Sequence, residues 1–228
     1  QLASLAESAF DPLSRTCRFM LTEEAHHMFV GDTGIARVVQ RTCDLMREHR
    51  TDDVGPHGGV SLALLQKYLN FHFSVSLDLF GSEVSSNAAT YYTAGIKGRF
   101  EETKKDDDHL LKDAAYPVAQ LRDGGIVMAD MPALNAMNER LRDDYVTDCA
   151  RGLVRWNQVI KRAGIEFEFR LPHRAFHRQI GNFAGAQVSP DGQVMDAAAW
   201  AARAADWLPT DEDRAFVIGL MRPVTEPG

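Results

Sequence analysis

The apolar residues of the first 164 positions recur mostly at spacings of three and four, which indicates amphipathic helices. One stripe predicts a helix over about residues 13–47, and a second predicts a helix from Leu62 into the low nineties. A third predicts a helix over residues 134–163, which Gly164 would close as a C-terminal glycine does. Long helices with apolar faces favour an all-α fold, in which residues 1–164 form a helical bundle.

The remaining segments have other patterns. The residues Asp123-Gly124-Gly125 and the apolar residues 126–128 predict a turn and a short strand, so that a short hairpin interrupts the bundle near 121–132. Residues 96–121 carry helix formers throughout. Residues 166–170 alternate as a short strand does. The chain from 165 to 228 is then expected to be an irregular C-terminal extension, with short helices over residues 196–206 and 210–220.

Composition excludes several classes of protein. The 228 residues carry a formal net charge of −7, which argues against a nucleic-acid binder that neutralises phosphates. No stretch approaches the roughly 20 apolar residues of a membrane span. The three cysteines have no CxxC spacing, so a disulfide scaffold or thiolate zinc site is not indicated. These features predict a soluble, cytoplasmic protein without nucleic-acid or membrane partners.

The first candidate for chemistry is the segment LTEEAHH in the middle of the first helix. Two acid-x-x-His pairs overlap there, and residues three apart lie on one helix face, where a carboxylate and an imidazole can bind one metal. Continuing the apolar stripe places Glu24 and His27 at core positions, whereas Glu23 and His26 lie about 100° away. The alternatives are an ordinary buried ion pair or a pair that faces solvent.

A second pair of this kind occurs in Asp106-Asp107-Asp108-His109, where Asp106 and His109 repeat the spacing. Taken alone, this segment could be a solvated acidic cluster at a helix start. Two such pairs in one helical chain favour a bundle interior in which two helices each supply acid-x-x-His and two others each supply a single carboxylate, around two iron or manganese ions.

The single carboxylate of the intervening helix has two candidates, Asp78 and Glu83. Asp78 lies 28 positions before Asp106, which suits two antiparallel arms of about three and a half turns, and Asp78 interrupts an apolar stripe. Glu83 would shorten these arms. The carboxylate of the remaining helix would precede Gln1, so either one ligand is missing or the first helix of the bundle lies upstream of this chain, and we expect the latter.

Several segments together resemble one family, and they are the stretches 21–31 (LTEEAHHMFVG), 77–89 (LDLFGSEVSSNAA), 106–109 (DDDH) and 134–145 (LNAMNERLRDDY). They are similar to the oxygenase components of benzoyl-CoA 2,3-epoxidases, which are ferritin-like class I di-iron proteins of aerobic aromatic degradation. The resemblance covers most of the chain, including the extension after Gly164.

The resemblance implies a ferritin-like helical bundle and a monooxygenase that uses O2 to epoxidise the ring of benzoyl-CoA or a related aryl-CoA. Electrons would come from NADPH through a separate flavin and iron–sulfur reductase. Two iron ions would be the cofactor, with Glu24 and His27 on one iron, Asp106 and His109 on the other, and Asp78 as a further ligand. Aspartate at position 106 departs from glutamate and shortens one ligand arm by a methylene.

Other residues are candidates for contacts with the coenzyme A tail. Basic residues precede the second pair and could line an entrance or simply be solvated, namely Lys97, Arg99, Lys104 and Lys105. His173 and His177 lie in a basic segment and are interpreted as surface or substrate-tail contacts. The three tryptophans are expected in the core. The competing function is a non-catalytic ferritin-like metal-binding protein or a helical interaction module.

Overall fold

The computed structural model describes residues 2–85, 90–91, 94–96 and 114–221. In these residues the fold is mostly helical, as expected, with one two-stranded sheet. The helices are α1 (Leu2–Ala6), α2 (Asp11–His49), α3 (Leu62–Asp78), α6 (Met137–Ala163), α7 (Ala197–Trp207) and α8 (Asp211–Leu220), and the strands are β1 (Ala115–Arg122) and β2 (Gly125–Pro132). None of the helices in the described ranges combines the length and the apolarity needed to cross a membrane.

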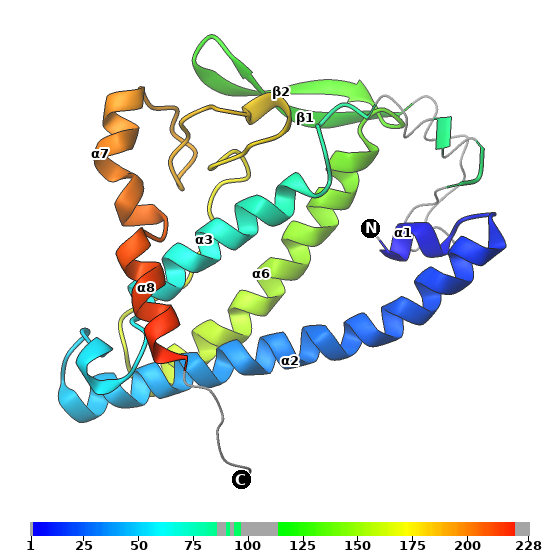
Figure 1. The fold of residues 1–228 in the computed structure, drawn as a ribbon. Helices are drawn as coiled ribbons and strands as arrows, with labels where there is room; N and C mark the ends of the chain where they lie inside the picture. Colours follow the sequence, from blue (N-terminus) through cyan, green and yellow to red (C-terminus); the bar gives the residue numbers. More distant parts are fainter. Residues whose placement is uncertain (1, 86–89, 92–93, 97–113, 222–228) are drawn as a thin grey trace.

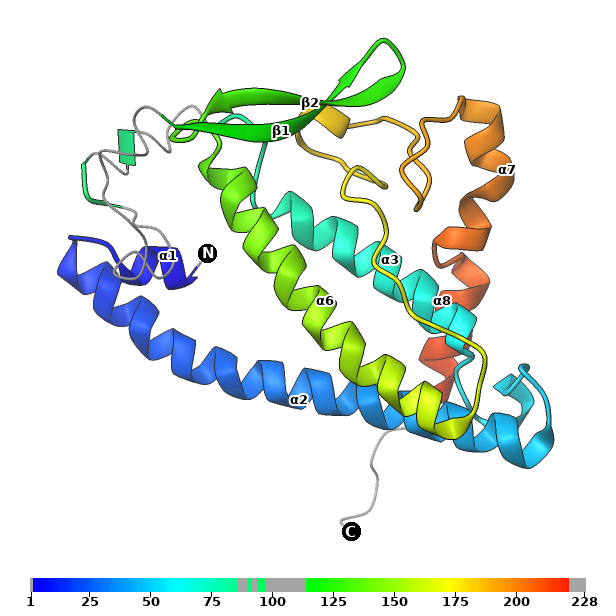
Figure 2. The same cartoon turned by 180° about the vertical axis from the view of Figure 1, so that it is seen from behind.

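Helices α2, α3 and α6 form the framework. α2 runs along one side of the molecule, and α6 descends from the hairpin to meet the C-terminal part of α2, while α7 and α8 lie beyond α3 (Figures 1 and 2). The main core lies where these elements converge, and its buried members are Val39, Cys43, Leu62, Leu153, Ile160 and Phe169. A second, smaller core joins β1 to the C-terminal extension, through Ala119, Ala175, Phe183 and Val188.

α2 is long and is buried only near its two ends. Its 39 residues extend about 58 Å at 1.5 Å per residue. The buried residues are Ser14 and Cys17 near the start and four residues between Val39 and Leu45. No residue from 18 to 38 is buried by the described part of the chain. Large apolar side chains are exposed there, namely Phe19, Met20, Met28, Phe29, Val30 and Ile35.

α3 is shorter than predicted. Ser61 caps its start by accepting a hydrogen bond from the backbone N–H of Leu64, but the helix ends at Asp78 and does not continue into the low nineties. Gly81 has a φ of +85°, and the Arg142 guanidinium donates to the carbonyls of Leu77 and Gly81 at 3.2 and 2.5 Å. These carbonyls are therefore satisfied by a side chain from α6. The prediction of a long helical arm after Asp78 is therefore wrong.

The hairpin is confirmed, but it begins earlier than expected. β1 and β2 are antiparallel, with Ala115 opposite Pro132 and Arg122 opposite Gly125. Asp123 and Gly124 both have positive φ, 50° and 75°, as a two-residue turn of this kind requires. The helical interpretation of residues 96–121 is wrong from Ala115 onward, where the chain forms β1.

The extension after α6 is irregular, as expected, except for the proposed strand. Residues 166–170 belong to no sheet. Instead, the side-chain amide of Asn157 bonds both the N–H and the C=O of Phe169, at 2.8 and 3.0 Å. The amide of Gln66 bonds the same two groups of Arg170, at 3.0 and 2.8 Å. The two predicted short helices are present as α7 and α8, each within one residue of the expected bounds at both ends.

Candidate functional site

Glu24 and His27 form a contact in the middle of α2. The Nδ1 atom of His27 lies 3.5 Å from Oε1 of Glu24, and their side chains are 63% and 45% exposed respectively. The i,i+3 spacing therefore brings one carboxylate and one imidazole together, as the sequence predicted. Neither side chain is buried by the described residues, so the expected core position of the pair is not reached within them.

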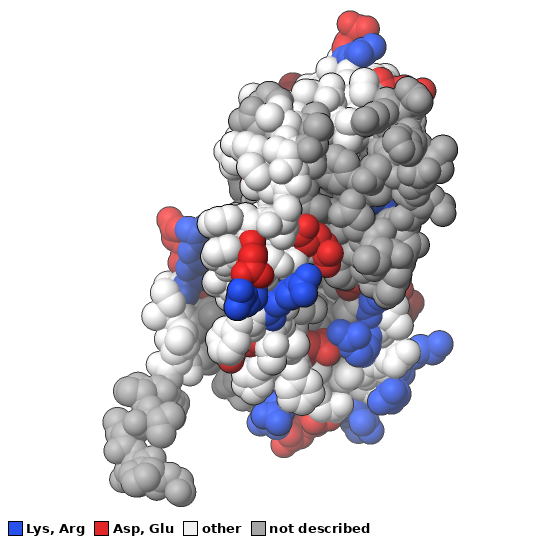
Figure 3. Space-filling model, turned by 90° about the vertical axis from the view of Figure 1, so that its right-hand side faces the viewer, with Lys and Arg blue, Asp and Glu red and all other residues white. Residues whose placement is uncertain are grey.

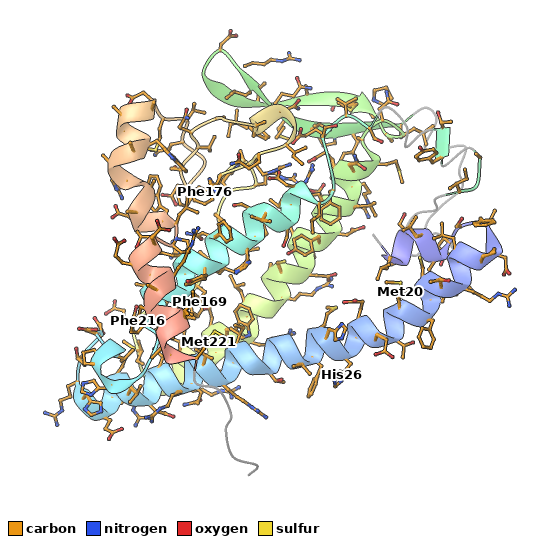
Figure 4. The ribbon with its side chains drawn as sticks, in the orientation of Figure 1. Met20, His26, Phe169, Phe176, Phe216 and Met221 are labelled. Carbon is orange, nitrogen blue, oxygen red and sulfur yellow. The ribbon has the colours of Figure 1, made fainter. Side chains whose placement is uncertain are left out.

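The alternative acid-x-x-His pair in this motif uses His26, which lies on a different side of α2. Figure 4 shows His26 on the side of α2 that faces away from α3 and α6. Its ring centroid is 6.4 Å from that of His27, with the rings tilted by 53°. His26 and His27 are thus distinct positions, and only one of them shares a contact with Glu24.

The described residues do not assemble the whole predicted metal centre. Asp106 and His109 lie outside the residues that the structure describes. In the part that it does describe, no three His, Cys, Asp or Glu side chains converge as a metal ion would require. Glu24 and His27 are therefore not joined by Asp78 here, and the five-residue ligand set stays a prediction.

Asp78 is held by the C-terminal extension. Its Oδ1 accepts a hydrogen bond from Nε of Arg178 at 2.5 Å, and its Oδ2 accepts one from the backbone N–H of Gln179 at 2.9 Å. Both carboxylate oxygens of Asp78 therefore have donors, which tie the end of α3 to the segment after Arg174.

Glu83 lies nearby and is more deeply buried, with a side chain that is 1% exposed. Its Oε2 accepts from the backbone N–H of Asn182 at 2.5 Å. Its Oε1 lies 3.6 Å from Arg178 and 3.9 Å from Arg142, and it accepts no hydrogen bond from the described residues. This buried oxygen therefore faces two arginines without a direct hydrogen bond from the part of the chain that the structure describes.

The approach of Asn182 to Glu83 depends on Gly181. This glycine has a φ of +86°, and a Cβ placed on it would collide with the Glu83 carboxylate. Only glycine combines this backbone conformation with the necessary space. The segment is therefore shaped to bring a backbone N–H to a buried carboxylate.

These two acidic residues belong to a larger arginine–carboxylate cluster, which we define as Asp78, Glu83, Glu139, Arg142, Asp143, Arg174 and Arg178. Arg142 is fully buried and contacts both Glu83 and Glu139. Burial lowers the pKa of Arg142 to about 10, and Arg178 and Arg174 act in the same direction. The cluster joins α3, α6 and the extension through charge pairs.

Tyr116 extends the cluster to the hairpin. Its hydroxyl donates to Asp143, which Arg174 also contacts. Burial and this hydrogen bond raise the pKa of Tyr116 to about 12. The cluster as a whole was not predicted from the sequence. The signal available was the run of charges at 139–144, which is also typical of a solvated helix.

The two histidines of the extension are half-buried, and their interpretation as surface or substrate-tail contacts stays a prediction. The His177 ring stacks against Trp200 at a centroid distance of 6.4 Å, and the His173 ring packs against Gly192. Burial lowers the pKa of both histidines. Trp156 borders the main core, as expected, while Trp200 and Trp207 contact Phe176 and are only partly buried.

The basic residues proposed to meet the coenzyme tail lie outside the described residues, at Lys97, Arg99, Lys104 and Lys105. On the face shown in Figure 3, basic and acidic side chains of the described residues are interspersed. That face shows no broad patch of one sign.

The described residues define a mostly helical protein with a carboxylate–imidazole pair at metal-ligand spacing on its longest helix. No family model matches the chain. Benzoyl-CoA oxygenase component B of Aromatoleum evansii is 57% identical to it over 231 residues, which include the whole of this chain and 49% of the relative. The chain therefore spans about half the length of that relative. This match confirms the resemblance that the sequence motifs indicated.

Proposed function

We propose that this chain is part of an oxygenase component that epoxidises the aromatic ring of benzoyl-CoA or a related aryl-CoA. The observation that carries the proposal is 57% identity along the entire chain to a benzoyl-CoA oxygenase component. The relative is named as component B, which supports a system of several components. We propose that a flavin and iron–sulfur reductase delivers electrons from NADPH, in the cytoplasm.

The proposed cofactor is a pair of iron ions in a ferritin-like bundle. The donor set fits, because carboxylate oxygens and imidazole nitrogens suit iron. Glu24 and His27 are already in contact, and each is accessible enough to turn toward a metal. They would hold one iron, and Asp106 and His109 would hold the other. The centre would supply the activation of O2.

The contacts of Asp78 and Glu83 bear on which of the two supplies the remaining carboxylate ligand. Asp78, the residue predicted from spacing, uses both oxygens on donors from the extension. Glu83, its alternative, is 1% exposed, accepts from Asn182 and faces both Arg142 and Arg178. Both carboxylates are therefore engaged within the cluster, and Asp78 stays the proposed ligand. In either case the arginines of the cluster would hold the chosen side chain in place.

The test is made on the full-length protein, with metal analysis and O2 consumption after addition of reductant and benzoyl-CoA. We expect close to two irons per chain and uptake of O2 that depends on benzoyl-CoA. His27→Ala is expected to lose iron and activity while the protein stays folded, because its side chain is exposed in this chain and packs against no described core residue. Any fall in the melting temperature should be matched by removal of iron from the wild-type protein.

His26→Ala is the matched control, since His26 is one residue away and lies on a different face of the same helix turn. It should retain iron. Loss of iron in His26→Ala with retention in His27→Ala would show that the register is wrong. An iron-free, folded protein would leave the competing interpretation, a helical interaction module with ion pairs.

A further inference from the structure

A groove of about 660 Å³ lies between α2, α3 and α6. Its floor includes the buried side chains of Phe73 and Leu153, and Met28, Phe29 and Ile35 of α2 form an exposed apolar rim. This volume lies within the usual range of small-molecule sites, roughly 300–1,000 Å³. The groove is large enough for a ring and part of its tail.

The groove begins just after the candidate metal pair along α2, and neither Glu24 nor His27 is part of its lining. Met28, Gly31 and Ile35 line it, and they lie four, seven and eleven positions after Glu24. These spacings place them on the same face of α2 as Glu24. A ligand in the groove would therefore lie along the helix beside the Glu24–His27 pair.

Several polar groups of the groove are bonded to one another. The indole N–H of Trp156 donates to Asp32 at 2.9 Å, and Arg155 bonds the same carboxylate. The hydroxyl of Tyr145 is hydrogen-bonded with Ser76 and Cys149. His72 and Asp148 also line the groove, but most of its surface is apolar and includes the rings of Phe29, Phe73, Tyr145 and Trp156. Such a lining favours an aromatic group over a polar ligand.

Two glycines widen the groove from opposite walls, Gly31 on α2 and Gly152 on α6. A Cβ added to Gly31 would meet no atom within 4 Å, and one added to Gly152 would meet only the end of Arg155 at 4.0 Å. A larger side chain at either position would therefore extend into the groove without a clash with the backbone.

We propose that this groove receives the aromatic acyl group of the substrate, and that Gly31 and Gly152 determine how large a group it admits. The proposal rests on the proposed function, since it takes an aryl-CoA as the ligand. It assigns the apolar part of recognition to α2, α3 and α6.

The experiment measures binding of benzoyl-CoA and of free coenzyme A by calorimetry, with the iron-loaded full-length protein and no reductant, so that no turnover occurs. The wild-type protein should bind benzoyl-CoA more tightly than coenzyme A, by roughly 10- to 100-fold, which is the effect of burying one phenyl ring. Gly31→Leu and Gly152→Leu should each reduce this preference at least tenfold and leave coenzyme A binding unchanged.

Gly34→Leu is the matched control. Gly34 lies on the same helix with open space around it, but it does not line the groove. Each variant is also melted, and leucine should not weaken a helix in which it replaces glycine. We expect Gly34→Leu to keep the full preference for benzoyl-CoA over coenzyme A, and Gly31→Leu and Gly152→Leu to lose it.

Two results would overturn the proposal. One is an unchanged preference in both Gly31→Leu and Gly152→Leu, which would leave the proposed function intact. The other is an equal loss in Gly34→Leu, which would mean that the apolar face of α2 packs against another helix. A wild-type protein without preference for benzoyl-CoA would instead refute the proposed function, and the groove assignment with it.

Discussion

Replacement of Arg142 by methionine tests the buried arginine–carboxylate cluster. The Arg142 guanidinium is fully buried, contacts Glu83 and Glu139, and donates to the carbonyls of Leu77 and Gly81. Removing one partner of a buried ion pair costs about 3–5 kcal/mol, because the other charge is left uncompensated. Methionine fills much of the space, so little of the cost should come from a cavity.

The structure places the expected loss at the lower end of that range. Burial lowers the pKa of Arg142 to about 10, so desolvation of its charge offsets part of what the pairs contribute. Arg178 also remains beside Glu83. We therefore expect Arg142→Met to lower the free energy of unfolding by about 3 kcal/mol.

Urea unfolding at 25 °C and pH 7 measures this loss. The control is Arg151→Met on the same helix, where an exposed pair with Asp148 should contribute less than about 1 kcal/mol. Arg142→Met leaves the buried Glu139 carboxylate with Arg174 as its remaining cation, 3.4 Å away. Adding Glu139→Gln removes this incompletely compensated charge and should recover about 1–2 kcal/mol. If the double variant is no more stable than Arg142→Met, the buried Glu139 charge is not the cause and the reasoning fails.

Two further predictions concern the extension. Gly181→Ala should lower the free energy of unfolding by about 2–4 kcal/mol, because it adds strain at positive φ and a collision with Glu83. The control is Gly164→Ala, at φ +72° in open space, which should cost about 1 kcal/mol. Equal losses in urea unfolding would contradict this account. Burial lowers the pKa of His177, although the nearby Asp78 opposes this shift. The folded state therefore binds a proton at His177 less readily than the unfolded state does, so the free energy of unfolding should fall as the pH drops below about 6.5. His177→Asn, which tolerates the φ of +50°, should lose less stability than the wild type between pH 7.5 and 5.0, and an unchanged loss would refute the assignment.

Elements whose signals are local were predicted well. α6 ends at Ala163 with Gly164 at φ +72°, as expected from the glycine that closes an apolar stripe. The turn of the hairpin follows from Asp123-Gly124, where both residues need positive φ. In these cases the residues that determine the structure lie within a few positions of it.

The features that were missed depend on residues far apart in the chain. α3 ends at Asp78, where Arg142, more than 60 positions later in the chain, donates hydrogen bonds to the carbonyls of Leu77 and Gly81. β1 forms because β2 pairs with it, although its own composition did not exclude a helix. In the candidate site, the Glu24–His27 contact follows from helical spacing, whereas the environment of Asp78 and Glu83 depends on Arg178, which nothing near α3 indicates.

The way in which residues 169–170 are held has a consequence for local unfolding. Their backbone groups bond to the side-chain amides of Asn157 and Gln66, and not to another strand. Rotation of two side chains is enough to release these bonds, and no helix need unwind. The start of the extension passes across α3 in Figure 2 and is fixed there both by these bonds and by Phe169, which is buried in the main core. Its opening would expose Phe169 but leave the hydrogen bonds of α3 and α6 intact.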